Sequence, residues 1–168
     1  MRYEITVKVN GEDYEAYIPA RRTLLDFLRD DLGLRGTKKG CDEGDCGSCV
    51  VLLDGTPVNS CMVLAVEVNG REVTTIEGLA KGDELHLVQR AFVEQGAIQC
   101  GYCTPGMVLA GKALLDVNPH PTTTEIKEAI SGHLCRCTGY GAIVEAIQAA
   151  AESMDGGQRA SGKTGRSD

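Results

Sequence analysis

Eight cysteines restrict the folding of this 168-residue chain more than any other feature of its sequence. They form two groups of four, one in each half of the chain. The first group is Cys41, Cys46, Cys49 and Cys61, and the second is Cys100, Cys103, Cys135 and Cys137. Aromatic residues make up only 4% of the chain, so its core must use aliphatic side chains or rely on something other than side-chain bulk.

The use of these thiols depends on the cellular compartment. The N-terminal sequence MRYEITVKVNG lacks the apolar core of a signal peptide, and no segment reaches the roughly 18 apolar residues of a membrane span. We therefore expect a cytoplasmic protein in a reducing compartment, where disulfides are rare and metal ligation is the leading use of cysteine. A net charge of −7 gives no electrostatic footprint for nucleic-acid binding.

Short strands and one helix are predicted for the N-terminal half. Alternating polarity and Asn-Gly or Asp-Gly turns predict strands over residues 4–9, 14–18, 49–53 and 65–76. The helix is expected over residues 24–32, with Thr23 and Asp26 forming a capping box. These elements make residues 1–77 an α+β domain.

The C-terminal half has the periodicity of helices joined by short connections. Helices are predicted over residues 85–95, 105–117, 123–131 and 140–153. Their expected caps are Asp83, Thr104, a Thr122–Glu125 capping box, and Thr138 or Gly139. We expect these helices to form a small bundle over residues 78–154, followed by a disordered tail over residues 155–168.

The first cysteine group has the spacing C-x4-C-x2-C, followed by a distant fourth cysteine. This is the spacing of plant-type [2Fe–2S] clusters. Gly40, Gly44 and Gly47 let the backbone approach a compact anionic cluster and donate N–H groups to its sulfurs. Structural zinc is the alternative, but zinc sites usually pair two short cysteine knuckles, and Cys61 has no near partner in the sequence.

The second cysteine group has the spacing C-x2-C followed by a distant C-x-C, which is compatible with zinc on spacing alone. Both of its pairs directly precede predicted helix starts, at Thr104 and at Thr138. Two helix N-termini direct N–H groups and positive dipole ends toward one anionic centre, and this favours a cluster with four thiolates.

Two redox centres in one small chain predict a path for electrons. The sequence has no G-x-G-x-x-G after a strand and no P-loop for a further cofactor. We therefore expect the chain to connect two centres that it does not itself contain. Two alternatives stay open: a freely diffusing two-cluster ferredoxin-type electron carrier, and a zinc-stabilised interaction module.

Two motifs carry a resemblance to a known family: QCGYCTPGM at 99–107 and LCRCTGY at 134–140. Together with the first cysteine group, they resemble the iron–sulfur subunit of molybdenum hydroxylases, the family of xanthine dehydrogenase, aldehyde oxidoreductases and aerobic carbon monoxide dehydrogenase. The resemblance covers residues 3–153. It implies a β-grasp, ferredoxin-like N-terminal domain, a C-terminal four-helix bundle and one [2Fe–2S] cluster in each, with all eight cysteines as ligands.

The resemblance also implies partner subunits: a large one with the molybdopterin cofactor and a medium one with FAD, in a heterotrimer or a dimer of heterotrimers. Substrate electrons would enter at molybdenum, pass to the second cysteine group and then the first, and leave through the flavin. Gln99 and the Cys137 sulfur are implied to lie near the pterin, although Gln99 taken alone is typical of a helix-end cap. No catalytic residue is expected in this chain, and the implied substrate is an N-heterocycle, a purine, an aldehyde or CO.

Overall fold

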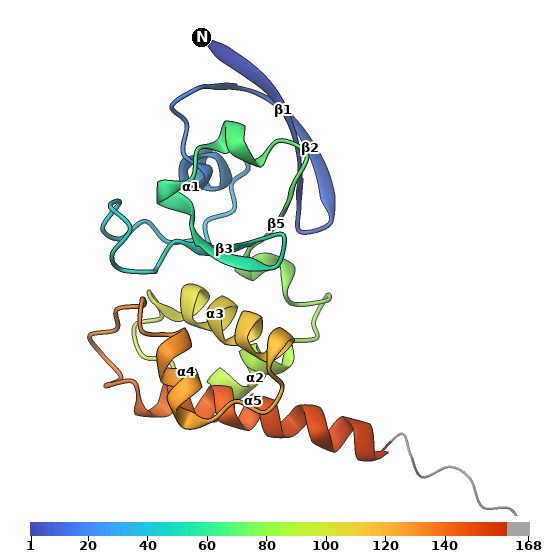
Figure 1. The fold of residues 1–168 in the computed structure, drawn as a ribbon, viewed down its shortest axis with the longest axis vertical. Coiled ribbons are helices and arrows are strands. Elements are labelled where there is room, and N and C mark those ends of the chain that lie inside the picture. Colours follow the sequence, from blue (N-terminus) through green and yellow to red (C-terminus); the bar gives the residue numbers. More distant parts are fainter. Residues whose placement is uncertain (161–168) are drawn as a thin grey trace, which may run out of the picture.

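The structure is a computed structural model that describes residues 1–160, with side chains placed up to residue 154. A sheet-containing N-terminal half and a helical C-terminal half lie one above the other (Figure 1). Within the C-terminal half, helix α3 (Thr104–Val117) is the helix that lies against the sheet. The mixed α+β class predicted from the sequence is therefore confirmed.

The N-terminal half contains a five-stranded mixed sheet in the order β2-β1-β5-β3-β4. Its strands are β1 (Arg2–Val9), β2 (Glu12–Pro19), β3 (Val50–Leu53), β4 (Thr56–Asn59) and β5 (Glu72–Thr74). β1 and β2 form the predicted hairpin, because Asn10 and Gly11 both adopt the positive φ that a two-residue turn needs. β5 pairs in parallel with β1 and antiparallel with β3, which leaves β2 and β4 as the edges.

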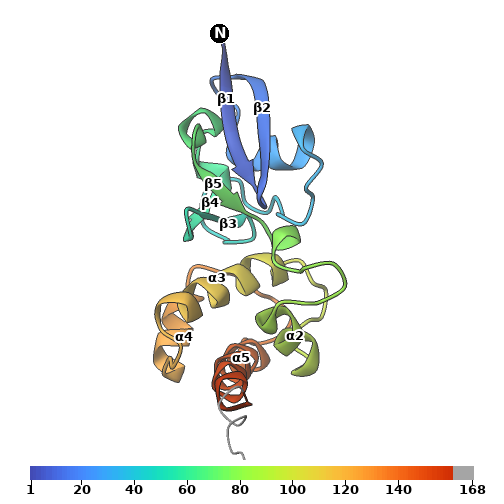
Figure 2. The same ribbon diagram turned by 90° about the vertical axis from the view of Figure 1, so that its right-hand side faces the viewer.

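Strand β3 joins the two halves of the chain. All four of its residues are buried, but they face opposite sides. Val51 and Leu53 pack into the core of the sheet half, whereas Val50 and Leu52 pack into the core of the helical half. Because side chains alternate along a strand, one short strand supplies both cores. Figure 2 shows α3 lying beneath the sheet half, where it meets β3.

The helix predicted after Thr23 exists as α1 (Leu24–Asp26), continued by a π-helical turn over Phe27–Asp31. Thr23 caps it as expected, since its hydroxyl accepts the N–H of Asp26 at 3.1 Å. The other half of the predicted capping box is wrong, because the Asp26 carboxylate binds Lys39 Nζ at 3.0 Å instead. This ion pair ties the helix to the loop of the first cysteine group.

The strand predicted within residues 65–76 is right only at its C-terminal end, where β5 lies. The first part, Ala65–Val68, forms a 3-10 turn instead. Ala65 and Val68 are both fully buried. Residues three apart lie on one side of a 3-10 helix, so a turn buries this pair on one face where a strand would point them to opposite faces.

Four helices make up the described part of the C-terminal half: α2 (Leu87–Glu94), α3 (Thr104–Val117), α4 (Thr123–Ala129) and α5 (Gly141–Ala160). The predicted Thr122 cap of α4 is confirmed. The predicted cap of α2 is wrong, because Asp83 lies in a turn closed by Lys81 and Glu84, and the His86 ring nitrogen accepts the Val88 N–H instead.

Helices α3 and α5 also differ in detail from the prediction. Cys103, rather than Thr104, occupies the cap position of α3, and α5 begins at Gly141 rather than directly after Thr138 or Gly139. A tail is predicted from residue 155, but α5 continues to Ala160; the rest of that segment, 161–168, lies outside the described residues. Within the described part, no helix combines the length and apolar character that crossing a membrane requires.

The capping box at the start of α4 predicts a pH-dependent contribution to stability. The Glu125 carboxylate accepts the Thr122 N–H at 2.6 Å and the Thr122 hydroxyl at 2.7 Å. These bonds lower the pKa of Glu125 from its ordinary value of 4.5. The stabilisation is therefore present above pH 4.5 and is lost as the pH falls through the lower pKa of the folded state.

Glu125→Gln is expected to flatten the acid-side fall in unfolding free energy, measured by urea denaturation across this pH range. Thr122→Ala is expected to lower the unfolding free energy at neutral pH by about 1 kcal/mol, because an N-cap hydroxyl is lost. Thr124→Ala, at an exposed position of the same helix, serves as the control. If the unfolding free energy of the Glu125→Gln protein fell with acid as steeply as that of the wild type, it would contradict the stabilising role of the Glu125 carboxylate.

Candidate metal centres

The first cysteine group is gathered by the loop before β3 and by the turn after β4. The Cys41 sulfur accepts the N–H groups of Asp45 at 3.3 Å and Cys46 at 3.4 Å, and the Cys46 sulfur accepts the Cys41 N–H at 3.4 Å. The sulfurs of Cys49 and Cys61 lie 3.4 Å apart. The fold therefore brings these four thiols together as two pairs.

The two pairs of the first group differ in electrostatic environment. Backbone N–H groups of Glu43 and Cys46 lower the pKa of Cys41 to about 7. Burial, and then the neighbouring Cys49, raise the pKa of Cys61 to about 12. Metal ligation needs thiolates, and a buried thiolate beside another one is unfavourable unless a cation compensates both. This group therefore suits a metal centre whose cations bind the buried pair, Cys49 and Cys61, as well as the pair Cys41 and Cys46.

The second cysteine group comes from two loops of the helical half. Cys103 lies at the start of α3, and its thiol lies close enough to that of Cys135 to raise its own pKa. Cys100 and Cys137 are likewise neighbours, at the exposed surface, where Cys100 raises the pKa of Cys137. The second group thus also consists of two pairs, one inner and one exposed.

The inner pair of the second group has one thiol that ionises readily and one that does not. Burial, and then contact with Cys135, raise the pKa of Cys103 to about 12. Burial also acts to raise the pKa of Cys135, but hydrogen bonds from the side chain and backbone of Thr138 outweigh it, and the pKa falls to about 7. Thr138 Oγ1 lies 3.2 Å from the Cys135 sulfur.

The paired arrangement distinguishes between the two kinds of metal centre that the spacing allows. A structural zinc ion needs four donors around one point, whereas a [2Fe–2S] cluster spreads four thiolates over two irons. Among the described residues, no three His, Cys, Asp or Glu side chains are grouped to hold a single metal ion. All eight cysteines lie in the described part and are free thiols. The pairing of the thiols in both groups is the arrangement that a diiron cluster with two thiolates on each iron requires.

Gly40 supports the prediction that glycine lets the backbone of the first loop close around its sulfurs. A Cβ at this position would lie only 2.7 Å from the Cys46 sulfur. Ordinary contacts begin near 3.4 Å, so any side chain here would displace a predicted ligand.

The residues predicted to approach a pterin lie at the exposed side of the second group. Gln99 and Cys137 are both exposed, next to Cys100. The interpretation of Gln99 as a helix-end cap is wrong, because α2 ends at Glu94 and is closed by Gln95. The contact of Gln99 and Cys137 with a pterin stays a prediction.

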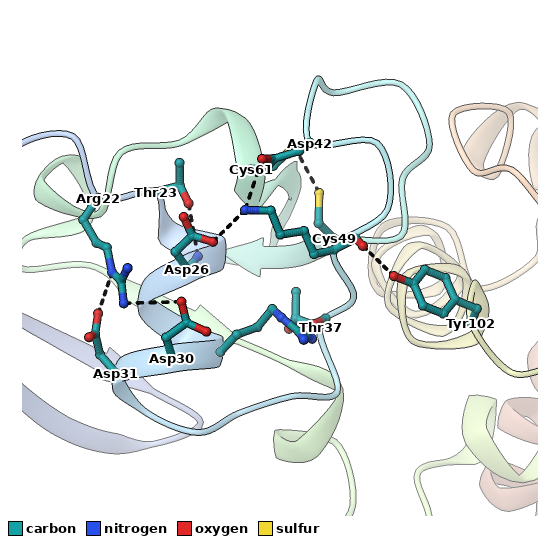
Figure 3. Close-up of polar contacts among 12 residues, drawn as sticks. Arg22, Thr23, Asp26, Asp30, Asp31, Thr37, Asp42, Cys49, Cys61 and Tyr102 are labelled. Carbon is teal, nitrogen blue, oxygen red and sulfur yellow. Dashed lines mark hydrogen bonds and ion pairs between the residues drawn. The ribbon is translucent and has the colours of Figure 1, made fainter.

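Polar contacts connect the loop of the first group to both halves of the chain. Lys39 Nζ pairs with Asp26 at 3.0 Å and with Asp42 at 3.1 Å. The Tyr102 hydroxyl, from the loop of the second group, donates to the Lys39 carbonyl at 2.5 Å. Figure 3 shows Asp26, Asp42 and Tyr102 converging on this segment from three directions. The two cysteine loops are therefore linked directly by a hydrogen bond.

Tyr102→Phe is expected to lower the unfolding free energy by about 1 kcal/mol, because one hydrogen bond between the halves is lost without loss of the ring. Urea denaturation of the metal-loaded protein measures the change. Tyr17→Phe is the control, since Tyr17 is 64% exposed on the far hairpin. Equal stability of the two variants would show that the Tyr102 contact contributes nothing.

Sequence patterns did not identify the side chain that shapes the loop of the second group. The Tyr140 hydroxyl accepts the Cys135 N–H at 2.9 Å and donates to the His133 carbonyl at 3.2 Å. Tyr140 itself adopts a positive φ of 69°, and Thr138 Oγ1 accepts its N–H at 3.2 Å. The tyrosine of the LCRCTGY motif is the only sequence signal for this arrangement, which folds the chain back over the cysteines.

Two family models match the chain, one in each half. Residues 7–80 match the family described as "2Fe-2S iron-sulfur cluster binding domain", and residues 75–148 match the family described as "[2Fe-2S] binding domain". Each match contains one of the two cysteine groups. The chain therefore consists of two 2Fe-2S binding domains in series.

Curated relatives and solved structures agree with these matches. The nicotinate dehydrogenase small FeS subunit of Eubacterium barkeri is 49% identical over 148 residues, which cover 88% of this chain and 94% of the relative. A chain of quinoline 2-oxidoreductase from Pseudomonas putida 86 aligns with a TM-score of 0.88 and 44% identity, over 93% of this chain and 98% of that one. Aldehyde oxidoreductase from Desulfovibrio gigas aligns with a TM-score of 0.88 and 39% identity over 92% of this chain, but over 17% of its own longer chain. The resemblance predicted from the two C-terminal motifs is confirmed, and this chain belongs to the iron–sulfur subunits of the molybdenum hydroxylase family.

Proposed function

We propose that this chain is the electron-transfer subunit of a molybdenum hydroxylase. It relays electrons from a molybdopterin centre in a large partner subunit to FAD in a medium partner subunit. The observation that carries the proposal is the presence of two sets of paired thiols in one chain, one in each 2Fe-2S binding domain. One such site stores an electron, whereas two in series form a path.

The proposed ligands divide by domain. The first cluster is held by Cys41, Cys46, Cys49 and Cys61, and the second by Cys100, Cys103, Cys135 and Cys137. Each cluster, when bound, accepts and releases one electron at a time. The chain itself supplies hydrogen-bond donors to the sulfurs, such as the backbone N–H of Asp45 toward Cys41. No acid or base of this chain takes part, because bond making belongs to the large subunit.

Electrons are proposed to enter at the second site and to leave from the first. The exposed pair Cys100 and Cys137 makes the second site accessible to a partner surface. Gln99 lies beside this pair and makes no hydrogen bond within the described residues, so its amide is free to meet the pterin together with the Cys137 sulfur.

The proposal includes a division into two folded domains. Residues 1–77 are assigned to a β-grasp, ferredoxin-like domain, which the order of its mixed sheet supports. Residues 78–154 are assigned to a four-helix bundle, in which α5 contacts α2, α3 and α4. A cytoplasmic location is part of the same proposal, because eight free thiols suit a reducing compartment.

The proposed substrate of the complex is a nitrogen heterocycle. Relatives named for nicotinate and quinoline support this class. Purines, aldehydes and CO are the alternatives, since the substrate pocket lies in another subunit. The assembly is proposed to be a heterotrimer or a dimer of heterotrimers.

Electron paramagnetic resonance on the reduced, anaerobically purified complex tests the proposal. Two distinct [2Fe–2S] signals and about four irons per chain are expected, and larger subunits are expected to co-purify. One signal, or zinc without inorganic sulfide, would contradict the two-cluster assignment. A freely diffusing carrier would instead purify as a lone monomer with both signals.

A further inference from the structure

Three backbone segments meet where the two halves of the chain touch. The first is the loop of the first site at Cys46 and Gly47. The second is the first turn of α3, at Gly106. The third is the loop over residues 132–134, just before the last cysteine pair. The junction is therefore built from the segments that carry the proposed ligands of both clusters.

Contact at this junction is between backbones rather than side chains. A Cβ at Gly106 would lie 2.4 Å from the carbonyl oxygen of Gly47, and a Cβ at Gly47 would lie 2.5 Å from the carbonyl oxygen of Gly132. Ordinary contacts begin near 3.4 Å, so a methyl group at Gly106 requires a shift of about 1 Å. Because the obstacle is a backbone oxygen, no change of rotamer relieves it, and the segments themselves must separate.

His133 and one hydrogen bond complete the junction. The His133 side chain is only 6% exposed, and neither ring nitrogen has a hydrogen-bond partner within the described residues. Its ring carbon Cδ2 would lie 3.2 Å from a Cβ at Gly106, so the ring fills the remaining space. The Leu134 N–H donates to the Cys46 carbonyl at 3.0 Å, which fixes the third segment against the first.

We infer that Gly106, packed against Gly47 and His133, sets the separation of the two cluster sites and is a positioning residue for electron transfer between them. The inference rests on the proposed function. Each of the three segments carries a proposed ligand within three residues of the junction, so a displacement there moves one site relative to the other. These ligands are Cys46, Cys103 and Cys135.

The step concerned is the transfer of one electron. The second site is oxidised by one electron and the first site is reduced by the same electron, with no bond formed or broken and no proton moved. The rate of such a step falls steeply with distance. A junction widened by a single methyl group is therefore expected to slow the transfer while all eight ligands stay in place.

Gly106→Ala in the full-length chain, purified within its complex, tests the inference. With both clusters reduced, the magnetic dipole interaction between them falls with the inverse cube of their separation. We expect the variant to retain wild-type iron content and both resonance signals. The magnetic dipole interaction between the two clusters is expected to be weaker than in the wild type. Rapid-freeze reduction is expected to show slower passage of electrons from the second site to the first.

Gly111→Ala is the matched control, because it makes the same change in the same helix away from the junction. A Cβ at Gly111 would meet side-chain atoms of Ile147, at 3.0 Å, within the helical core. This variant is expected to keep the wild-type interaction between the clusters. If Gly106→Ala with both clusters loaded also keeps it, the inference is wrong.

His133→Ala provides a second test that adds no atoms and applies even if Gly106→Ala fails to assemble. Removing the ring empties the space between the three segments, so the interaction between the clusters is expected to change while iron content does not. An interaction equal to wild type in this variant overturns the inference. Failure of the proposed function is a separate outcome, since the wild-type complex would then lack two [2Fe–2S] signals.

Discussion

Cys103→Ala is expected to remove the second cluster and leave the first intact. Cys103 belongs to the inner pair of the second site, where its thiol contacts Cys135, and loss of one thiolate leaves one iron with incomplete ligation. The iron content should fall from about four to about two per chain. One of the two resonance signals should disappear, and electron transfer from the molybdenum centre to the flavin should be lost.

Cys49→Ala is the reciprocal variant, and each protein serves as the control for the other. Cys49 pairs with Cys61 at the first site, so this change is expected to remove the other signal and a similar amount of iron. If either folded variant lost both resonance signals, or kept both, the assignment of the ligands to two independent sites would be contradicted. Replacement of iron by zinc in the wild-type chain would contradict it as well.

Truncation of either phenylalanine is expected to destabilise the whole chain. Phe27 lies in the core of the sheet half and Phe92 in the core of the helical half, and neither is exposed to solvent. Phe27→Ala and Phe92→Ala should each lower the unfolding free energy by about 3–5 kcal/mol, through lost burial and the cavity left behind. Because β3 contributes side chains to both cores, we expect one shared transition in each variant.

Anaerobic urea titration, followed by helix circular dichroism and by the visible absorbance of the clusters, measures this effect. Both probes should shift together to lower urea concentration in both variants. Val117→Ala, at a position 82% exposed, is the control and should change the unfolding free energy by less than about 0.5 kcal/mol. A Phe27→Ala protein whose helical half unfolds at the wild-type midpoint would contradict the coupling through β3.

Predictions from the sequence succeeded where the relevant residues are neighbours along the chain. The β1–β2 hairpin depends on an Asn-Gly turn, and the start of α4 depends on Thr122 and Glu125 three positions apart. Where a competing contact comes from elsewhere, local patterns failed. Asp26 fits a capping box, but Lys39 takes its carboxylate.

The strand prediction at 65–68 failed for a related reason. Alternating apolar residues fit a strand, yet the segment lies over the sheet core and buries Ala65 and Val68 on one side, as a 3-10 turn does. The cap of α2 also depends on context, because the Lys81–Glu84 bridge holds Asp83 in a turn away from the helix. The first outcome depends on the sheet core, which the local pattern of residues does not show; the second depends on a turn that competes with the helix cap.

The sequence by itself determined the two cysteine groups, the α+β class and the family, because spacing, turns and motifs are properties of residues close together in the chain. Only the tertiary structure decided how the thiols pair, with Cys49 against Cys61 and Cys103 against Cys135. It alone also placed the backbone of Gly47 against Gly106, where the two sites approach each other. The thiol pairs join residues that are distant in the sequence but lie within one half of the chain. The contact between Gly47 and Gly106 forms where the sheet half and α3 pack together.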